Sequence, residues 1–317
     1  MNLSPRRIAL AVLTPIVALL VAACGTSVEP APQPTQTQEP TTQATTATAS
    51  PSASEAPLQV ALASSDVSVG SNRIAFGLID SVSGPLRNAS DVQLTTFFLT
   101  SAGQEGPIED VKAIFRQWPS GLSGVYTSQV SFDRAGDWGL GVVVTGADGS
   151  TRTGSARISV REVSLSPAIG SPVPRSKSKT SRDVASLEEL TSDSNPDHAL
   201  YEMTIAEALD TGKPLVVTFA TPAYCRTSTC GPQVDVIRDS KAQHQGEANY
   251  IHIETFDNPQ EIQGDLSNAR VSPTFTEWNL PSDPWTFVVD AEGMVYAKFE
   301  GFATLEELEE ALSGVLQ

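Results

Sequence analysis

Basic side chains, histidine, methionine and cysteine are all scarce in this sequence, and their scarcity limits what the protein can bind. The chain has 20 Lys and Arg against 37 Asp and Glu, so its formal net charge at pH 7 is −17. An acidic surface repels nucleic acid, which is therefore excluded as an expected partner. The three histidines and three methionines form no sequence cluster that would hold copper, and we expect neither a metal ion nor a cofactor.

Long apolar runs are also missing, except near the N-terminus. Two arginines precede an apolar stretch at 8–20, which is too short for a comfortable membrane span and is typical of an export signal. The next residues, VAAC at 21–24, resemble a bacterial lipobox. That resemblance implies a signal peptide at 1–23 and a lipid attached to Cys24. Ordinary signal cleavage beside an unrelated cysteine is the alternative.

Residues 24–57 are rich in Pro, Thr and Ser and contain almost no large apolar side chain. Such a segment cannot bury enough surface to offset the entropy of ordering it, so we expect a disordered tether after the lipidated cysteine. Together these features predict a protein anchored by lipid on the extracytoplasmic face of the cell membrane. In that oxidising compartment the two remaining cysteines, Cys225 and Cys230, are expected to form a disulfide.

Residues 58–163 predict an all-β domain. Several runs alternate apolar and polar residues, and turn-forming residues such as Ser83-Gly84-Pro85 separate them, which is typical of an antiparallel sandwich. The stretch GVYTSQVSFDRAGDWGLGVVV, at 124–144, resembles immunoglobulin-like domains of the YtkA and FixH kind. We expect its Tyr126 and Trp138 in the core. The expected strands are 73–80, 91–100, 111–118, 124–133, 137–146 and 151–160.

Residues 164–197 are expected to be a linker and an entry segment to the next domain. They are rich in Ser and Pro and carry the densest basic run of the chain. We favour a solvated linker, and the alternative is weak contact of the basic side chains with anionic headgroups. The basic residues are Arg175, Lys177, Lys179 and Arg182.

Residues 198–317 predict an α/β domain. The apolar run at 213–220 predicts a buried central strand, and Thr304 with Glu307 forms a capping box for the last helix. The order of elements is strand, cysteine loop, helix, strand, helix, proline, hairpin and helix, which resembles the thioredoxin fold. Further helices are expected at 201–212, from about Pro232 and at 259–268, and further strands at 249–256, 284–290 and 294–301.

Four short motifs support this resemblance. They are similar to segments of extracytoplasmic thioredoxins, peroxiredoxins and TlpA-type lipoproteins. The resemblance implies a thioredoxin-like domain and a thiol–disulfide oxidoreductase that exchanges with the thiols or disulfides of partner proteins. The motifs are AIGSPVP at 168–174, PLVVTFATPAYC at 214–225, TCGPQ at 229–233 and DPWTFVVDAEGMV at 283–295.

The position of the cysteine loop suits this chemistry. A thiol reacts as the thiolate, and the N-terminus of a helix stabilises an anion with its unpaired N–H groups and partial positive charge. A loop between a buried strand and a helix start places sulfur there, and Arg226 adds a nearby positive charge if its side chain points inward. A second cysteine within reach resolves the mixed disulfide.

The sequence departs from the thioredoxin pattern in three ways. The spacing is Cys-x4-Cys, so we favour Cys225 as the nucleophile with Cys230 as a displaced partner. In the other register Cys230-Gly231-Pro232 takes the family position, and Cys225 supplies the partner from the loop. In addition, Thr218 stands where a buried acid is common, and Tyr224 stands where a Trp often precedes the cysteine.

The family also places a cis-proline opposite the disulfide, and two prolines compete for this role. Pro284 directly precedes an apolar strand, as the pattern requires, and we choose it over Pro273. The catalytic residues expected from the resemblance are therefore Cys225, Cys230 and Pro284.

Other functions remain open at this point. In a non-catalytic binding lipoprotein, the bond between Cys225 and Cys230 would be a structural disulfide and the sandwich would bind the ligand. Copper delivery would need one of the histidines, which are His198, His244 and His252. Peroxidase chemistry does not fit, because Cys225 follows Pro222 too closely for that family's motif.

Overall fold

The computed structural model describes residues 58–316, apart from 88, 90, 120 and 122. The described residues fall within one compact unit. The signal peptide, Cys24 and the tether expected from the sequence lie outside them. In the described part of the chain, no helix combines the length and the apolar character that a membrane span requires.

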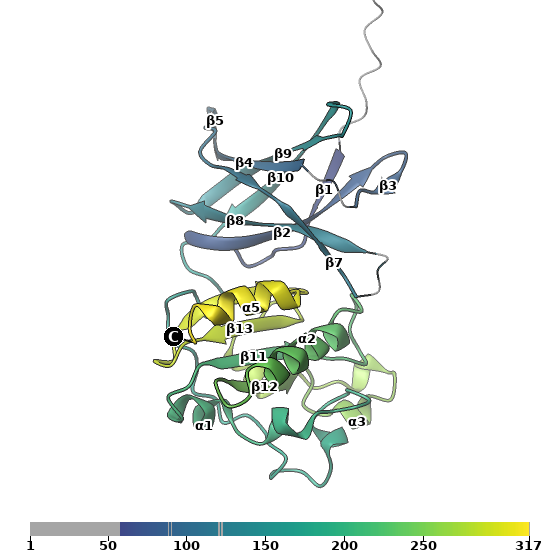
Figure 1. The fold of residues 1–317 in the computed structure, drawn as a ribbon, viewed down its shortest axis with the longest axis vertical. Helices are drawn as coiled ribbons and strands as arrows, with labels where there is room; N and C mark the ends of the chain where they lie inside the picture. The colour runs from purple at the N-terminus through teal and green to yellow at the C-terminus, as the bar shows by residue number, and fades with distance from the viewer. Residues whose placement is uncertain (1–57, 88, 90, 120, 122, 317) are drawn as a thin grey trace, which may run out of the picture. The chain divides into compact units, whose positions relative to one another are not determined.

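Residues 58–160 form the β lobe. Within the described residues its ten strands make one sheet with the path β5-β4-β9-β10-β1-β2-β8-β7, while β3 pairs with β2 and β6 pairs with β4 (Figure 1). The strands are β1 (Leu58–Leu62), β2 (Gly70–Asp80), β3 (Gly84–Pro85), β4 (Asp91–Thr100), β5 (Gly103–Glu105), β6 (Asp110–Lys112), β7 (Ile114–Gln117), β8 (Gly124–Phe132), β9 (Gly136–Thr145) and β10 (Thr151–Val160).

One hydrophobic core lies inside the β lobe, and it follows from the two-residue period of its strands. Alternate residues of β2 and β9 are buried in it, while the residues between them are more exposed, except that Ala75 on the other face of β2 is also buried. Trp138 and Tyr126 are buried in this core, as the sequence predicts. Their polar atoms are paired: Trp138 Nε1 donates to the carbonyl of Arg134, and the Tyr126 hydroxyl accepts from the amide of Ala89.

Two features of the β lobe differ from the prediction. The single strand expected at 111–118 is two strands, because β6 pairs with β4 whereas β7 pairs with β8. Ala113 lies between them and is buried. The strand β1 was not expected, and it is inserted in the middle of the sheet, parallel to β10 and antiparallel to β2.

Residues 164–316 form the α/β lobe, which is built on a four-stranded sheet in the described part of the chain. The strand order is β12-β11-β13-β14, with β11 and β12 parallel and the other pairs antiparallel. Together with the order of the helices, this is the thioredoxin-like fold that the sequence predicts. The strands are β11 (Leu215–Ala220), β12 (Asn249–Glu254), β13 (Trp285–Val289) and β14 (Val295–Glu300), and the helices are α1 (Ile205–Asp210), α2 (Cys230–Gln243), α3 (Pro259–Ile262), α4 (Pro273–Glu277) and α5 (Leu305–Ser313).

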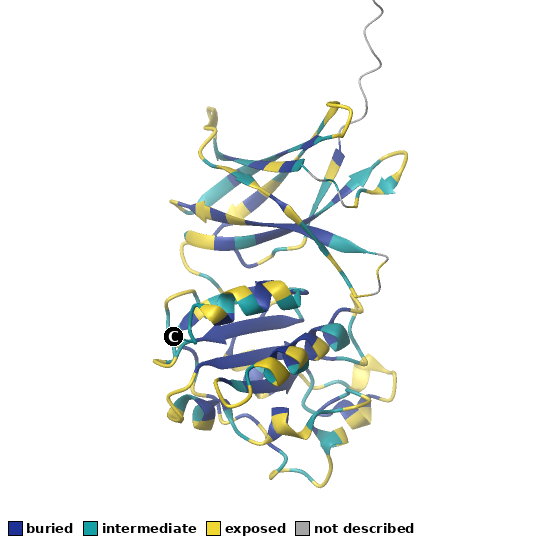
Figure 2. Cartoon of the chain, viewed as in Figure 1, coloured by how far each residue is buried: buried dark blue, intermediate teal, exposed yellow. Residues whose placement is uncertain are grey.

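The central strands β11 and β13 are buried along their whole length (Figure 2). They are continuous apolar runs because both faces of the sheet are covered. Val234 of α2 and Leu308 of α5 belong to the core on one face, and Ile205 of α1 and Trp278 belong to the core on the other.

Two predicted helices are shorter than expected. The helix expected at 201–212 begins at Ile205, because Thr204 and Glu207 form a capping box there. The one expected at 259–268 is α3 followed by a single 3-10 turn at Leu266–Asn268. Gln263 and Gly264 separate the two, and both have positive φ angles, which a right-handed helix cannot contain.

The serine-rich segment after the β lobe is part of the α/β lobe and is not solvated along its whole length, although its basic side chains lie in solvent as expected. Ser176 and Ser178 are buried, whereas the basic residues between and beside them are exposed. Trp278 Nε1 donates to Ser176 Oγ, and the amide of Ile205 donates to Ser178 Oγ. The basic side chains form ion pairs with acids of the same lobe, namely Arg175 with Asp210, Lys179 with Asp257 and Arg182 with Glu207.

Candidate functional site

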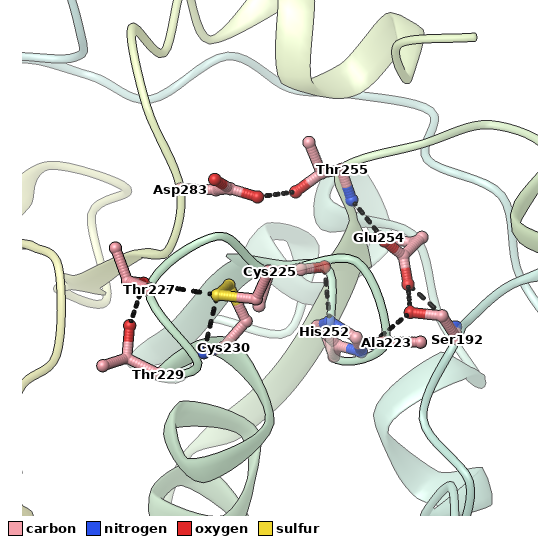
Figure 3. The surroundings of a disulfide bond; sticks show 11 residues. Ser192, Ala223, Cys225, Thr227, Thr229, Cys230, His252, Glu254, Thr255 and Asp283 are labelled. Atoms are coloured by element: carbon pink, nitrogen blue, oxygen red, sulfur yellow. Dashed lines mark hydrogen bonds between the residues drawn. A yellow bond between two sulfur atoms is a disulfide. The ribbon is translucent and has the colours of Figure 1, made fainter. Parts of the chain in front are cut away.

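Cys225 and Cys230 are joined by a disulfide at the N-terminus of α2, with a distance of 5.8 Å between their Cα atoms (Figure 3). The central strand β11 ends at Ala220 and leads directly into the cysteine loop. Ser228 takes a left-handed conformation with φ of 58°, which turns the loop back so that Cys230 becomes the first residue of the helix. The long Cys-x4-Cys spacing is thereby accommodated.

The two sulfur-bearing residues differ in exposure. Cys230 is 0% exposed, whereas Cys225 is only partly buried. A partner molecule can therefore reach Cys225 from solvent, while Cys230 lies behind it in the core of the α/β lobe.

Cys225 Sγ lies within hydrogen-bond distance of polar groups of the loop and helix. The amide of Cys230, the first of α2, donates to this sulfur over 3.2 Å. Thr227 Oγ1 lies 3.3 Å from the same sulfur and 2.7 Å from Thr229 Oγ1. A thiolate at Cys225 would accept these donors and would be stabilised by the helix N-terminus. Arg226, which the sequence places nearby, has an exposed side chain.

The peptide bond between Asp283 and Pro284 is cis, the geometry expected for this proline. Pro284 is buried and precedes β13, whose first residue Trp285 pairs with Phe219 near the end of β11. Pro273, the competing candidate, is the first residue of α4. Asp283 accepts a hydrogen bond of 3.2 Å from Thr255 Oγ1, and burial raises the pKa of its carboxyl group.

A buried acid does lie close to the cysteine loop, although not in the strand where the family often carries one. Thr218, in that strand, is paired with Thr286 over 2.9 Å. Instead, Glu254 ends the neighbouring strand β12 and is 5% exposed. Burial raises the pKa of Glu254 to about 7.

Glu254 is connected to the cysteine loop through one serine (Figure 3). The amide and hydroxyl of Ser192 both donate to Glu254 over 2.8 Å, and Ser192 Oγ accepts from the amide of Ala223 over 3.1 Å. The sequence reasoning missed both residues. The available signal was a carboxylate at the end of an apolar strand predicted to lie beside the one leading to Cys225.

The three histidines are separate from one another. His252 is buried, with Nδ1 2.7 Å from the Tyr201 hydroxyl and Nε2 3.1 Å from the carbonyl of Ala220. A carbonyl only accepts, so Nε2 carries the proton, and burial lowers the pKa of this imidazole to about 4. His244 pairs with Glu309, and His198 with Glu202. Among the described residues, no group of three or more His, Cys, Asp or Glu could hold a metal ion.

No protein-family model matches the chain. A search of curated proteins also finds no match. Among solved structures, one provisionally assigned as the thiol:disulfide interchange protein DsbE of Chlorobium tepidum is similar with a TM-score of 0.28 and 15% identity, over 34% of this chain and 82% of that chain. A second, a thiol:disulfide interchange protein of the thioredoxin family from Chlorobium tepidum TLS, has a TM-score of 0.30 and 16% identity, over 37% of this chain and 88% of that chain.

Proposed function

We propose that the protein is a thiol–disulfide oxidoreductase acting on partner proteins. The observation that carries this proposal is the asymmetry of the disulfide. Cys225 is partly exposed and its Sγ accepts the first amide of α2, while Cys230 is buried behind it. A bond that only pins a loop needs neither a partly exposed cysteine nor an anion-stabilising amide.

The reaction follows from this arrangement. In the reduced protein, the Cys225 thiolate attacks a disulfide of the partner, which forms a mixed disulfide and releases one partner thiolate. The Cys230 thiolate then attacks Cys225 Sγ, which releases the second partner thiolate and forms the Cys225–Cys230 bond. Two electrons pass from the protein to the partner, and two protons go to the released thiolates from solvent. The reverse direction uses the same intermediate.

We further propose that the protein works at the extracytoplasmic face of the cell membrane, held there by a lipid on Cys24 and the following tether. The support is the order of charged, apolar and small residues at positions 1–24. We also propose that the β lobe is an immunoglobulin-type sandwich, supported by the resemblance of residues 124–144 and by one core enclosed by many strands.

The test uses two single variants. Cys230→Ser leaves the accessible thiol without its resolving partner, so it should accumulate mixed disulfides with proteins from an extracytoplasmic extract, which non-reducing electrophoresis detects. Cys225→Ser, the matched control, should accumulate few because the remaining thiol is buried.

A measured reduction potential would contradict the proposal if it lay well below about −300 mV, where structural disulfides are found. Equal trapping by both variants would also contradict it. Either result would favour a binding lipoprotein with a structural disulfide.

A further inference from the structure

A groove lies between the β lobe and the cysteine loop. Its volume is about 450 Å³, within the range of ligand sites. Thr227 and Thr229 of the cysteine loop line it, as does Asp283 from the segment before the cis-proline. Cys225 itself does not line the groove, but Thr227, which does, has its Oγ1 only 3.3 Å from Cys225 Sγ, so the groove lies next to the atom at which the proposed exchange takes place.

The β lobe gives this groove an apolar wall. Ile74 and Phe76 of β2 face the core, so the alternate residues Ala75, Gly77 and Ile79 face outward, and all three line the groove. Leu62, Leu86 and Trp118 extend the wall. Ala75 has only a methyl group and Gly77 has no side chain, so this part of the wall projects little into the groove and leaves room for a ligand.

Of the four charged residues that line the groove, Arg73, Glu300 and Asp283 are engaged within the protein, and Arg87 is exposed to solvent. Arg73 donates to the Glu307 carboxylate and to the carbonyls of Glu300 and Phe302. The Glu300 carboxylate accepts from Ser65 and Ser282. A ligand that leaves these bonds in place gains free energy mainly by burying apolar surface. The groove therefore fits apolar side chains better than charged ones.

Trp118 of the β lobe lines the groove together with residues of the cysteine loop. Although it follows strand β7, it packs against the hydrophobic cluster of the α/β lobe, and so does Cys225. The chain has Tyr224 where the thioredoxin motif often has a Trp. The β lobe thus supplies an aromatic side chain to the same region from a distant part of the sequence.

We propose that this groove binds an extended segment of the partner protein in which apolar side chains lie within a few residues of the reactive cysteine. The β lobe is then the part of the molecule that selects substrates. This inference rests on the proposed function, because exchange at Cys225 is what brings a polypeptide to the groove.

Gly77→Leu is the variant that tests it. A Cβ atom at Gly77 would meet only Ala61 atoms at 3.9 Å, so the backbone tolerates a side chain there, and a leucine at this position would narrow the groove. The matched control is Gly139→Leu in β9, where a Cβ atom is also tolerated, with its nearest neighbour a Leu99 side-chain atom at 3.4 Å. Gly139 does not line the groove.

The assay uses the full chain, reduced with dithiothreitol and freed of it, and three disulfides as substrates. One is oxidised glutathione, and the other two are glutathionylated cysteine peptides with either Leu and Val or Ser and Gln beside the cysteine. We expect the unaltered protein to react with the apolar peptide about tenfold or more faster, in the second-order rate constant of a single turnover. Gly77→Leu should remove this preference, while Gly139→Leu should keep it. Both variants should reduce oxidised glutathione at the original rate.

Each other result counts against the inference. Equal rates with the two peptides in the unaltered protein would overturn it, and this measurement does not depend on any variant folding. A preference that survives in folded Gly77→Leu would place substrate selection elsewhere. A dimer seen by sedimentation and dissolved by Gly77→Leu would identify a second copy as the occupant. No reaction with any disulfide, oxidised glutathione included, would instead remove the proposed function itself.

Discussion

At the scale of single residues, the site depends on how each polar atom near the disulfide is satisfied. Glu254 needs several hydrogen-bond donors, because a buried carboxylate is stable only with donors around it. It has the amide and hydroxyl of Ser192 and the amide of Thr255. These bonds only partly offset burial, so the carboxyl group titrates near neutral pH instead of in the acidic range.

Glu254 predicts a pH dependence of stability. Its pKa is raised from 4.5 to about 7 in the folded protein, so the folded state holds this proton more tightly than the unfolded state does. The stability it contributes is fully present below about pH 4.5 and is lost as pH rises through about 7. The loss should approach about 3 kcal/mol.

Urea unfolding of the oxidised protein between about pH 5 and pH 8 measures this effect. The Glu254→Gln variant should gain stability relative to the unaltered protein as pH rises. Glu292→Gln, at an exposed turn residue, should run parallel to the unaltered protein. A constant difference between Glu254→Gln and the unaltered protein across this range would show that the carboxyl group does not titrate there.

At the scale of elements, Glu307 of helix α5 has two roles: it belongs to the capping box of the helix, and it forms an ion pair with a residue of the β lobe. Thr304 accepts from the amide of Glu307, and the Glu307 carboxylate accepts in return from the amide of Thr304. The same carboxylate pairs with Arg73 of the β lobe over 2.9 Å. The cap therefore also fixes the carboxylate that joins the helix to another part of the molecule.

Removing the cap hydroxyl gives a prediction for this element. Thr304→Ala should lower the free energy of unfolding by about 1 kcal/mol, because the amide of Glu307 loses its acceptor. Thr304→Ser, which keeps the hydroxyl, should restore most of the loss. If the Ala and Ser variants unfold at the same urea concentration, the hydroxyl does not stabilise the helix.

At the scale of the whole molecule, buried ion pairs connect the two lobes. Arg73 and Glu307 have side chains that are 5% and 7% exposed, and Lys298 pairs with the fully buried Asp66. Hydrogen bonds from Ser164 and Ser166 outweigh burial and lower the pKa of Asp66 to about 2. Pairs of this kind are expensive to break, because the remaining charge stays buried.

The Arg73→Met variant tests this connection. It leaves the Glu307 carboxylate buried with less compensation, so the free energy of unfolding should fall by about 3 to 5 kcal/mol. The double variant Arg73→Met, Glu307→Gln should recover part of this loss. Arg157→Met, at the exposed pair with Asp137, should cost no more than about 1 kcal/mol. Equal effects of the two single variants would show that Arg73 does not stabilise the contact between lobes.

The sequence allowed much of the α/β lobe to be predicted, because its signals are local. Continuous apolar runs marked β11 and β13, and the Thr304 cap marked α5. Long-range relations could not be read in this way. Ser192 reaches Ala223 from 31 positions earlier in a segment without periodicity, and the pairing partners of β6 and β7 depend on the whole sheet.

The place of β1 in its sheet has a mechanical consequence. Because this first described strand lies between β10 and β2, tension applied to the chain ahead of Leu58 is resisted by hydrogen bonds on both of its edges at once. Leu58 is also buried in the core of the lobe. Pulling the strand free would therefore uncover that core, so the fold resists a force applied through its N-terminal end.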